Sequence, residues 1–166
     1  MRTLLPLTLF SALALTQGAF AQQDPGKEVV GKIKVEVFHG TNEQNVDLGK
    51  NAKAVPTEIT QRLQREQSTN FKTYALLGSD IKELFRSYEN WAEPVKPSDE
   101  IMVRFEAQSA PGADNATLDL ELWLGRKKIV KTDVKLTANK PLWVRGPTWR
   151  QGHLIIAVSM LPVKSK

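Results

Sequence analysis

Cysteine is absent from this 166-residue chain, and histidine occurs only twice, at His39 and His153. A protein without cysteine forms no disulfide, and it has no thiolate to bind a metal or to attack a substrate. Transition-metal sites need three or four ligands, usually with two of them close in sequence, whereas these two histidines lie far apart. We therefore expect no metal site and no cofactor.

The motifs of nucleophilic catalysis and of phosphate binding are absent as well. No serine occupies a Gly-x-Ser-x-Gly elbow, and no glycine-rich phosphate loop is present. One carboxylate pair is a lead: Asp119 and Glu121 should point the same way on one strand, about 7 Å apart, which suits an inverting glycosidase. Because such pairs occur on almost any solvent-facing strand, we expect a protein that is not an enzyme, with a carbohydrate-active hydrolase as the alternative.

Apolar runs of membrane-spanning length are also missing after the N-terminus. The N-terminal run Leu4–Leu15 is too short to be an anchor and follows the positively charged Arg2. Small residues at Ala19 and Ala21 then occupy the two positions that a signal peptidase reads. This layout predicts a signal peptide over residues 1–21, and we expect the rest of the chain to be periplasmic or secreted and not membrane-spanning.

Positive charge exceeds negative charge only slightly. The formal net charge is +5, and it falls to +4 once Arg2 leaves with the signal peptide. This excess favours acidic partners, but it is too small for the basic surface of a nucleic-acid-binding protein. The partners that we expect are therefore an unknown envelope protein or an anionic glycan of the envelope, and not a nucleic acid.

Strand patterns dominate what the sequence does contain. Polar and apolar residues alternate, or β-forming residues gather, along 32–40, 71–78, 100–108, 117–125 and 129–137. The nearly unbroken apolar run 153–161 predicts a central strand that is covered on both sides. We expect one core to contain Leu118, Leu120, Leu122, Ile155 and Val158.

Helical signals are confined to the first part of the chain. Residues 55–67 place Val55, Ile59 and Leu63 on one stripe, with Pro56 at a first helical position. Residues 80–92 are ambiguous between helix and strand, because their apolar side chains keep helical spacing while a strand would give a poorer alternation. We favour a helix there.

Together these patterns predict an α+β fold, with a mostly antiparallel sheet or a small β-sandwich of about six to seven strands and one or two short helices near the N-terminal half. The early strand, helix and strand leave a parallel or an antiparallel pairing open. We expect residues 22–31 to be a flexible lead-in and residues 32–166 to be a single β-rich domain.

Several segments resemble a group of small exported bacterial proteins of unknown function. They are FKTYALLGSD, RSYENW, LDLELW and LIIAV, which together extend over most of the chain after the signal peptide. The resemblance brings no catalytic residue with it and therefore implies no reaction.

One stretch, WVRGPTWRQG over residues 143–152, concentrates tryptophan and arginine around two glycines and a proline. Its turn-forming residues predict a hairpin with a long loop before the apolar strand. Exposed tryptophan and arginine dominate binding patches, so the candidate binding residues are Trp143, Arg145, Trp149 and Arg150. We expect an exported, non-catalytic binding module; besides the hydrolase, the alternative is a structural subunit of an envelope assembly that docks through a sheet edge.

Overall fold

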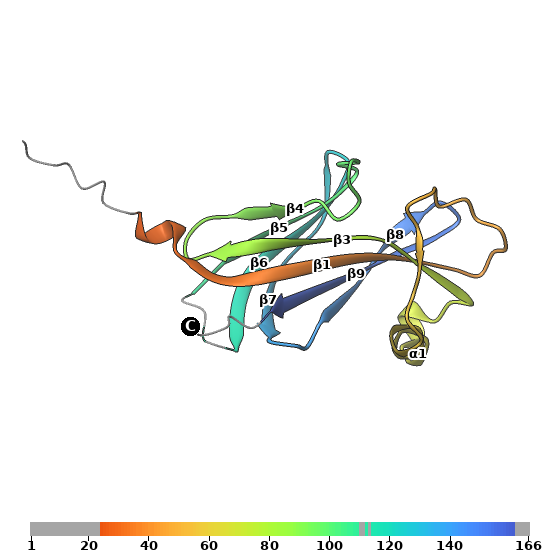
Figure 1. Ribbon diagram of the computed structural model, residues 1–166, viewed down its shortest axis with the longest axis horizontal. Coiled ribbons are helices and arrows are strands. Elements are labelled where there is room, and N and C mark those ends of the chain that lie inside the picture. Colours follow the sequence, from red (N-terminus) through yellow and green to blue (C-terminus); the bar gives the residue numbers. More distant parts are fainter. Residues whose placement is uncertain (1–23, 110–111, 113, 162–166) are drawn as a thin grey trace, which may run out of the picture.

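Alternating side chains build two antiparallel sheets that face each other across a common core (Figure 1). The computed structural model describes residues 24–109, 112 and 114–161. The expected signal peptide and its cleavage site after Ala21 lie outside these residues. The β-rich class that the sequence predicts is confirmed, and the nine strands among these described residues outnumber the six or seven expected.

The five-stranded sheet has the order β2-β3-β1-β9-β8, and every neighbouring pair is antiparallel. Its strands are β1 (Val29–Thr41), β2 (Lys53–Ala54), β3 (Thr73–Phe85), β8 (Leu142–Trp149) and β9 (Gly152–Leu161). The pairing of β1 with β3, which the sequence left open, is thus antiparallel. β1 begins inside the stretch 22–31, from which a flexible lead-in is expected, and a 3-10 turn at Pro25–Lys27 precedes it.

The four-stranded sheet is a meander in which each strand pairs with the next along the chain. Its strands are β4 (Asn90–Ala92), β5 (Ile101–Ala107), β6 (Asn115–Leu124) and β7 (Lys127–Thr137). The sequence locates the last three of these strands, because their polar and apolar residues alternate cleanly.

The described part of the chain contains one α-helix, α1 (Thr57–Arg65), which lies within the predicted stretch 55–67. Leu63 is the buried residue of this helix. Figure 1 shows α1 near the end of the five-stranded sheet at which β1 ends. A second 3-10 turn, Gln67–Thr69, follows it. None of the helices among the described residues has the length and apolar character needed to cross a membrane.

The helix that we favour over residues 80–92 is wrong, since β3 continues through Phe85 and β4 occupies Asn90–Ala92. β3 pairs with β1 along its whole length, so hydrogen bonds to a strand distant in sequence override the local spacing of apolar residues. Those residues do not share a buried face, because Leu84 is fully buried while Ile81 is 51% exposed.

Two cores lie on opposite faces of the five-stranded sheet, and the central strands β1 and β9 contribute to both. The main core fills the space between the sheets and includes Leu118, Leu120, Leu122 and Val158. The smaller core lies under α1 and consists of Phe38, Leu63, Ile155 and Ala157. The assignment of Ile155 to the main core is wrong, because residues separated by an odd number of positions on a strand point to opposite faces.

The β8–β9 hairpin does not have the long loop that the sequence predicts. The turn-forming residues at 146–147 lie at a break in register inside β8, which continues to Trp149. Only Arg150 and Gln151 form the turn, and both take positive φ angles, of 40° and 61°. Two consecutive positive φ angles are typical of a type I′ turn, which matches the twist of the flanking strands.

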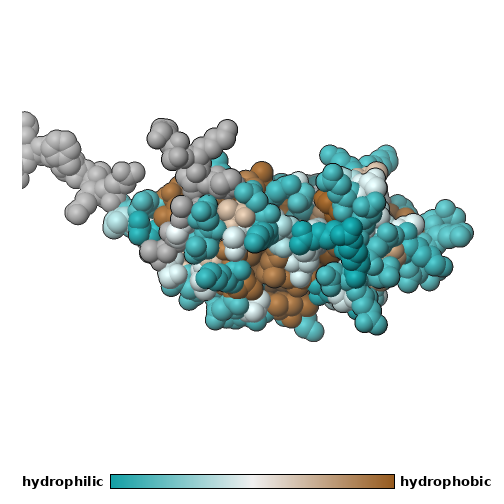
Figure 2. Space-filling model, turned by 90° about the horizontal axis from the view of Figure 1, so that it is seen from below, coloured by the Kyte–Doolittle hydropathy of each residue, from teal (hydrophilic) through white to brown (hydrophobic). Residues whose placement is uncertain are grey.

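The sandwich is open along the side where β7 and β8 lie. Each of these strands is at the edge of its sheet. Side chains that contact the main core here are only partly buried: Val130, Val134, Leu142 and Val144. Figure 2 shows that apolar side chains reach the surface in the middle of one face of the molecule.

Candidate functional site

The four candidate binding residues do not form one surface, because they lie on both sides of the five-stranded sheet. Trp143 packs against the smaller core. Together with Arg145 it lines a groove between α1 and β8. Trp149 packs against the main core between the sheets. Arg150 lies in the turn, with its guanidinium 4.4 Å from the centre of the Trp149 ring.

Trp149 closes one end of the main core and is held there by two hydrogen bonds. Its indole Nε1 donates to Glu100 Oε1 at 2.8 Å, and its backbone carbonyl accepts from His39 Nε2 at 3.0 Å. The rings of Trp149 and His39 meet edge to face, with centroids 5.8 Å apart. Trp149 therefore has a structural position, and Arg150 is the residue of this pair that reaches solvent.

Arg150 lies at the rim of a basic cleft. Two adjoining cavities, of about 410 and 210 Å³, form the cleft, since both are lined by Lys50, Asn51, Leu77 and Lys96. The four basic residues of the cleft come from three separate segments. Lys50 and Lys53 lie in the connection between β1 and α1, Lys96 follows β4, and Arg150 lies in the β8–β9 turn. All four are exposed.

Little negative charge offsets the cations of the basic cleft. Among the described residues, Lys96 is the one member of the four with an ion pair, at 3.7 Å from Asp80 and 4.0 Å from Glu93. Glu100 is the acidic residue that lines the cleft, and its carboxylate already accepts the Trp149 indole. The cleft therefore presents an excess of positive charge to solvent.

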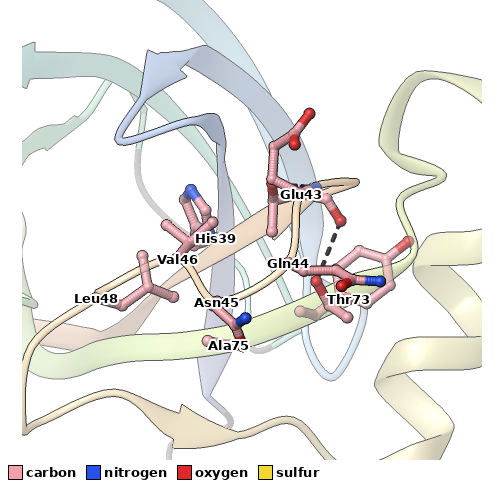
Figure 3. Close-up of a pocket in the computed structure, with 10 residues that line it drawn as sticks. His39, Glu43, Gln44, Asn45, Val46, Leu48, Thr73 and Ala75 are labelled. Carbon is pink, nitrogen blue, oxygen red and sulfur yellow. Dashed lines mark hydrogen bonds between the residues drawn. The ribbon is translucent and has the colours of Figure 1, made fainter.

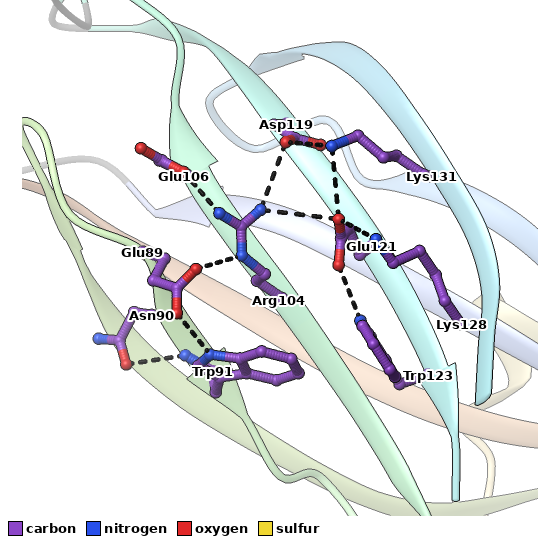
Figure 4. A network of polar contacts seen from close by, with 10 residues as sticks. All are labelled: Glu89, Asn90, Trp91, Arg104, Glu106, Asp119, Glu121, Trp123, Lys128 and Lys131. Atoms are coloured by element: carbon purple, nitrogen blue, oxygen red, sulfur yellow. Dashed lines mark hydrogen bonds and ion pairs between the residues drawn. The ribbon is translucent and has the colours of Figure 1, made fainter. Parts of the chain in front are cut away.

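Asp119 and Glu121 lie on the outer face of the four-stranded sheet, where a network of charged side chains covers them (Figure 4). Asp119 is 7% exposed and Glu121 is 4% exposed. Arg104 on β5 contacts both carboxylates, together with two further glutamates. The Lys131 ammonium lies 3.1 Å from Asp119 and 3.5 Å from Glu121, so a cation bridges the pair.

Glu121 stays ionised far into the acid range. The Lys128 ammonium, 2.7 Å from its carboxylate, lowers the pKa of Glu121 to about 2 against the opposing effect of burial. The Trp123 indole N–H donates to the same carboxylate at 2.9 Å and contributes to the lowering. A general acid must keep its proton near neutral pH, so Glu121 is unsuited to that role.

Glu121→Gln should remove a contribution to stability that depends on pH. A carboxyl group with a lowered pKa stabilises the fold above about pH 4.5, and this contribution is lost as the pH falls toward 2. We expect the substitution to cost about 1.5–3 kcal/mol at pH 6, the range of a hydrogen bond to a charged group, and clearly less at pH 3. Urea unfolding at both pH values measures the difference, and an equal cost at both would contradict the ion-pair account.

A separate pocket of about 410 Å³ lies beneath the segment that follows β1, and His39 forms part of its wall (Figure 3). His39 is fully buried, and this burial lowers the pKa of its imidazole. A Cβ at Gly152 would overlap the Nε2 of His39, which explains why glycine follows the turn. Within the part of the chain that the structure describes, no group of three or more side chains could hold a metal ion.

Sequence reasoning missed three of the basic-cleft residues, Lys50, Lys53 and Lys96. Isolated lysines in short or irregular segments carry no pattern. The pairing of β2 with β3 and the close contact of Gly78 with Pro94 bring these segments together. It also missed Trp91, whose ring centroid lies 5.8 Å from that of Trp123 on the outer face of the four-stranded sheet. Their polar neighbours belong to the network around the two carboxylates.

No family model, no curated protein and no solved structure matches this chain.

Proposed function

We propose that this protein is an exported, non-catalytic binding module that takes an anionic glycan of the bacterial envelope in the basic cleft. The observation that carries the proposal is the convergence of four cations, from three segments, on a cleft whose one lining carboxylate is already engaged. Two joined cavities suit a stretch of chain with spaced negative charges better than a compact ion.

Several weak contacts would supply the affinity. A single exposed ion pair is worth about 1 kcal/mol or less in water, so a ligand must meet several cations at once. Lys50, Lys53 and Lys96 offer mobile point charges, whereas Arg150 offers a planar fork that can bind one carboxylate through two hydrogen bonds. Because such contacts are screened by ions, binding should weaken as the salt concentration rises.

The walls of the basic cleft are fixed in part by a close backbone contact. The Gly78 Cα faces the carbonyl oxygen of Pro94 so closely that a Cβ would overlap it. Both residues line the larger cavity. The two segments that carry Lys53 and Lys96 are therefore held at a set separation, which lowers the ordering cost of binding.

The polar network around Asp119 and Glu121 supports a binding module better than the alternative hydrolase. An inverting glycosidase needs one protonated carboxyl group and room for a water molecule between the pair. Here the Lys131 ammonium contacts both carboxylates, and the pKa of Glu121 is about 2.

The double variant Lys50→Glu with Lys96→Glu should weaken the binding of polygalacturonate by about tenfold or more, equivalent to about 1.4 kcal/mol. Each substitution replaces an attraction in the cleft with a repulsion. Titration calorimetry at low and at physiological ionic strength measures the affinity. The matched control is Lys127→Glu with Lys135→Glu, which makes the same change in net charge on β7.

Two outcomes would contradict the proposal. Equal weakening in the cleft variant and in the control would show that net charge alone attracts the polymer. Failure of the parent protein to bind either polygalacturonate or dextran sulfate at low salt would remove the anionic glycan as the ligand. Neutral dextran serves as the uncharged reference polymer.

A further inference from the structure

A further cavity, of about 170 Å³, lies between α1 and β8 on the opposite face of the five-stranded sheet from Trp149. We call it the α1 groove, and its polar lining residues are Arg62, Glu66, Ser68, Thr69, Trp143 and Arg145. It shares no residue with the basic cleft. Whatever it binds is therefore independent of the function proposed above.

Both guanidiniums of the α1 groove are held over aromatic rings. The Arg62 guanidinium lies 5.5 Å from the centre of the Trp143 ring, and that of Arg145 lies 6.0 Å from the centre of the Phe71 ring. Arg145 Nη2 also donates to His153 Nε2 at 3.3 Å. Stacking on Phe71 and the contact with His153 fix the plane of the Arg145 guanidinium and leave N–H groups at its edge for a further acceptor, whereas Arg62 is exposed and has the ring contact alone.

Neither guanidinium has a carboxylate partner in the described part of the chain. The arginines that form ion pairs there are Arg86 and Arg104, each with a carboxylate oxygen at hydrogen-bond distance. Arg62 and Arg145 thus bring two uncompensated positive charges to one small cavity. Glu66 is the acidic residue that lines it, so the net charge of the lining is positive.

The indole N–H of Trp143 is the most specific observation. It is buried and has no hydrogen-bond partner among the described residues. The other three indoles each donate to a glutamate carboxylate: Trp91 to Glu89, Trp123 to Glu121 and Trp149 to Glu100. A buried donor without an acceptor costs about 1–3 kcal/mol, and such groups in native proteins call for an explanation. Because the other three indoles donate to carboxylate oxygens, a carboxylate is the acceptor that we expect beside the Trp143 indole.

We propose that the α1 groove binds the carboxylate group of a small ligand, held by Arg62, Arg145 and the Trp143 indole N–H. A carboxylate has two oxygens in one plane, which match the paired N–H groups of a guanidinium and leave lone pairs for the indole. Arg62 is exposed on α1, so its side chain can swing off the Trp143 ring and admit the ligand to the indole edge. The cavity of about 170 Å³ limits the ligand to a small acid or to the end of a chain.

Glu66 and Ser68 narrow the chemistry of the ligand further. The Glu66 carboxylate would repel a second negative charge, and it can accept a hydrogen bond from an O–H or N–H of the ligand. The hydroxyl of Ser68 can donate or accept. The groove therefore favours a singly charged acid that also carries a hydrogen-bond donor, such as a sugar acid or an acylated amino acid.

The Trp143 indole signal gives a direct test on the whole protein without its signal peptide. The chain has four tryptophans, so a proton–nitrogen correlation spectrum shows four indole signals, and the one lost in Trp143→Phe is that of Trp143. On titration with sodium glucuronate or with N-acetylglycine, this signal should move more than the other three. The methyl esters of both compounds, which lack the charge, should leave it unmoved.

Three variants separate the contributions to binding. Arg145→Ala should weaken binding of the carboxylate about tenfold or more, the size of one lost charge-assisted hydrogen bond. Arg62→Ala should do the same, whereas Arg65→Ala, an exposed arginine on the same helix that does not line the groove, should leave the affinity unchanged. Trp143→Phe should weaken binding as well, and its thermal melt verifies that the variant is folded.

Binding of either probe with these variant effects supports the proposal, and the tighter probe identifies the source as a sugar acid or a peptide-like acid. The proposal is overturned if neither probe moves the Trp143 signal, or if both bind equally well to the Arg145→Ala and Arg62→Ala variants. It is also overturned if inorganic phosphate binds as tightly as the carboxylates. Charge reversal at Lys50 and Lys96 should not affect this binding, so its failure and failure of the basic cleft are distinguishable.

Discussion

Phe38→Ala is expected to lower the free energy of unfolding by about 3–5 kcal/mol, as large-to-small substitutions in a core do. Phe38 is fully buried in the smaller core, and the centroid of its ring lies 5.6 Å from that of Trp143. Its removal leaves a cavity between the five-stranded sheet and α1 that the surrounding strands can fill only in part. Urea unfolding followed by circular dichroism measures the loss.

Two companion variants make the result decisive. Leu118→Ala, in the main core, should cost about 2–5 kcal/mol. Lys135→Ala, on the exposed side of β7, should cost less than about 0.5 kcal/mol. If Phe38→Ala costs no more than Lys135→Ala, the second core on the α1 side of the sheet does not contribute to stability.

Trp149→Ala should lower the stability by about 3 kcal/mol or more. The substitution removes the ring that closes one end of the main core, and it leaves the half-buried Glu100 carboxylate without its indole donor. The exposed neighbour Arg150 provides the control, because Arg150→Ala should change the thermal midpoint little while it weakens binding of polygalacturonate.

The pair of variants also decides between a structural and a binding role for this tryptophan. An unchanged midpoint in Trp149→Ala, together with weaker binding of the polymer, would mean that the ring projects from the hairpin in solution. A large drop in the midpoint supports the packed position, and Arg150 is then the residue of the turn that contacts a ligand.

The parts of the fold that the sequence predicts are those in which local pattern and tertiary contacts agree. β6 alternates leucine with polar residues. The leucines face the main core and the polar side chains lie on the outer face of the four-stranded sheet, so the local pattern matches the fold. In β3, by contrast, pairing with β1 outweighs the helical spacing of residues 81–91. The hairpin also differs, because a bulge inside β8 accommodates residues 146–147 that would otherwise form a turn.

The candidate sites were predictable only in part, for the same reason. Composition singles out Trp143 and Arg145, and both line the α1 groove. Arg62 was missed as a member of that site, since nothing in the helix sequence indicates which strand the helix will cover. A surface assembled from separate segments leaves no local pattern in the sequence, and the basic cleft is of this kind.

The order of strands in the five-stranded sheet bears on the time at which the protein can fold. β1 is the first strand of the described chain, and it lies between β3 and β9, the last of them. Until β9 has emerged and paired, β1 has an open edge, and both cores lack residues that β9 supplies. The five-stranded sheet and both cores are therefore completed only by contacts between distant parts of the chain, which are the slowest to form. If the chain is threaded through a membrane in an extended state, this topology delays folding until β9 has passed.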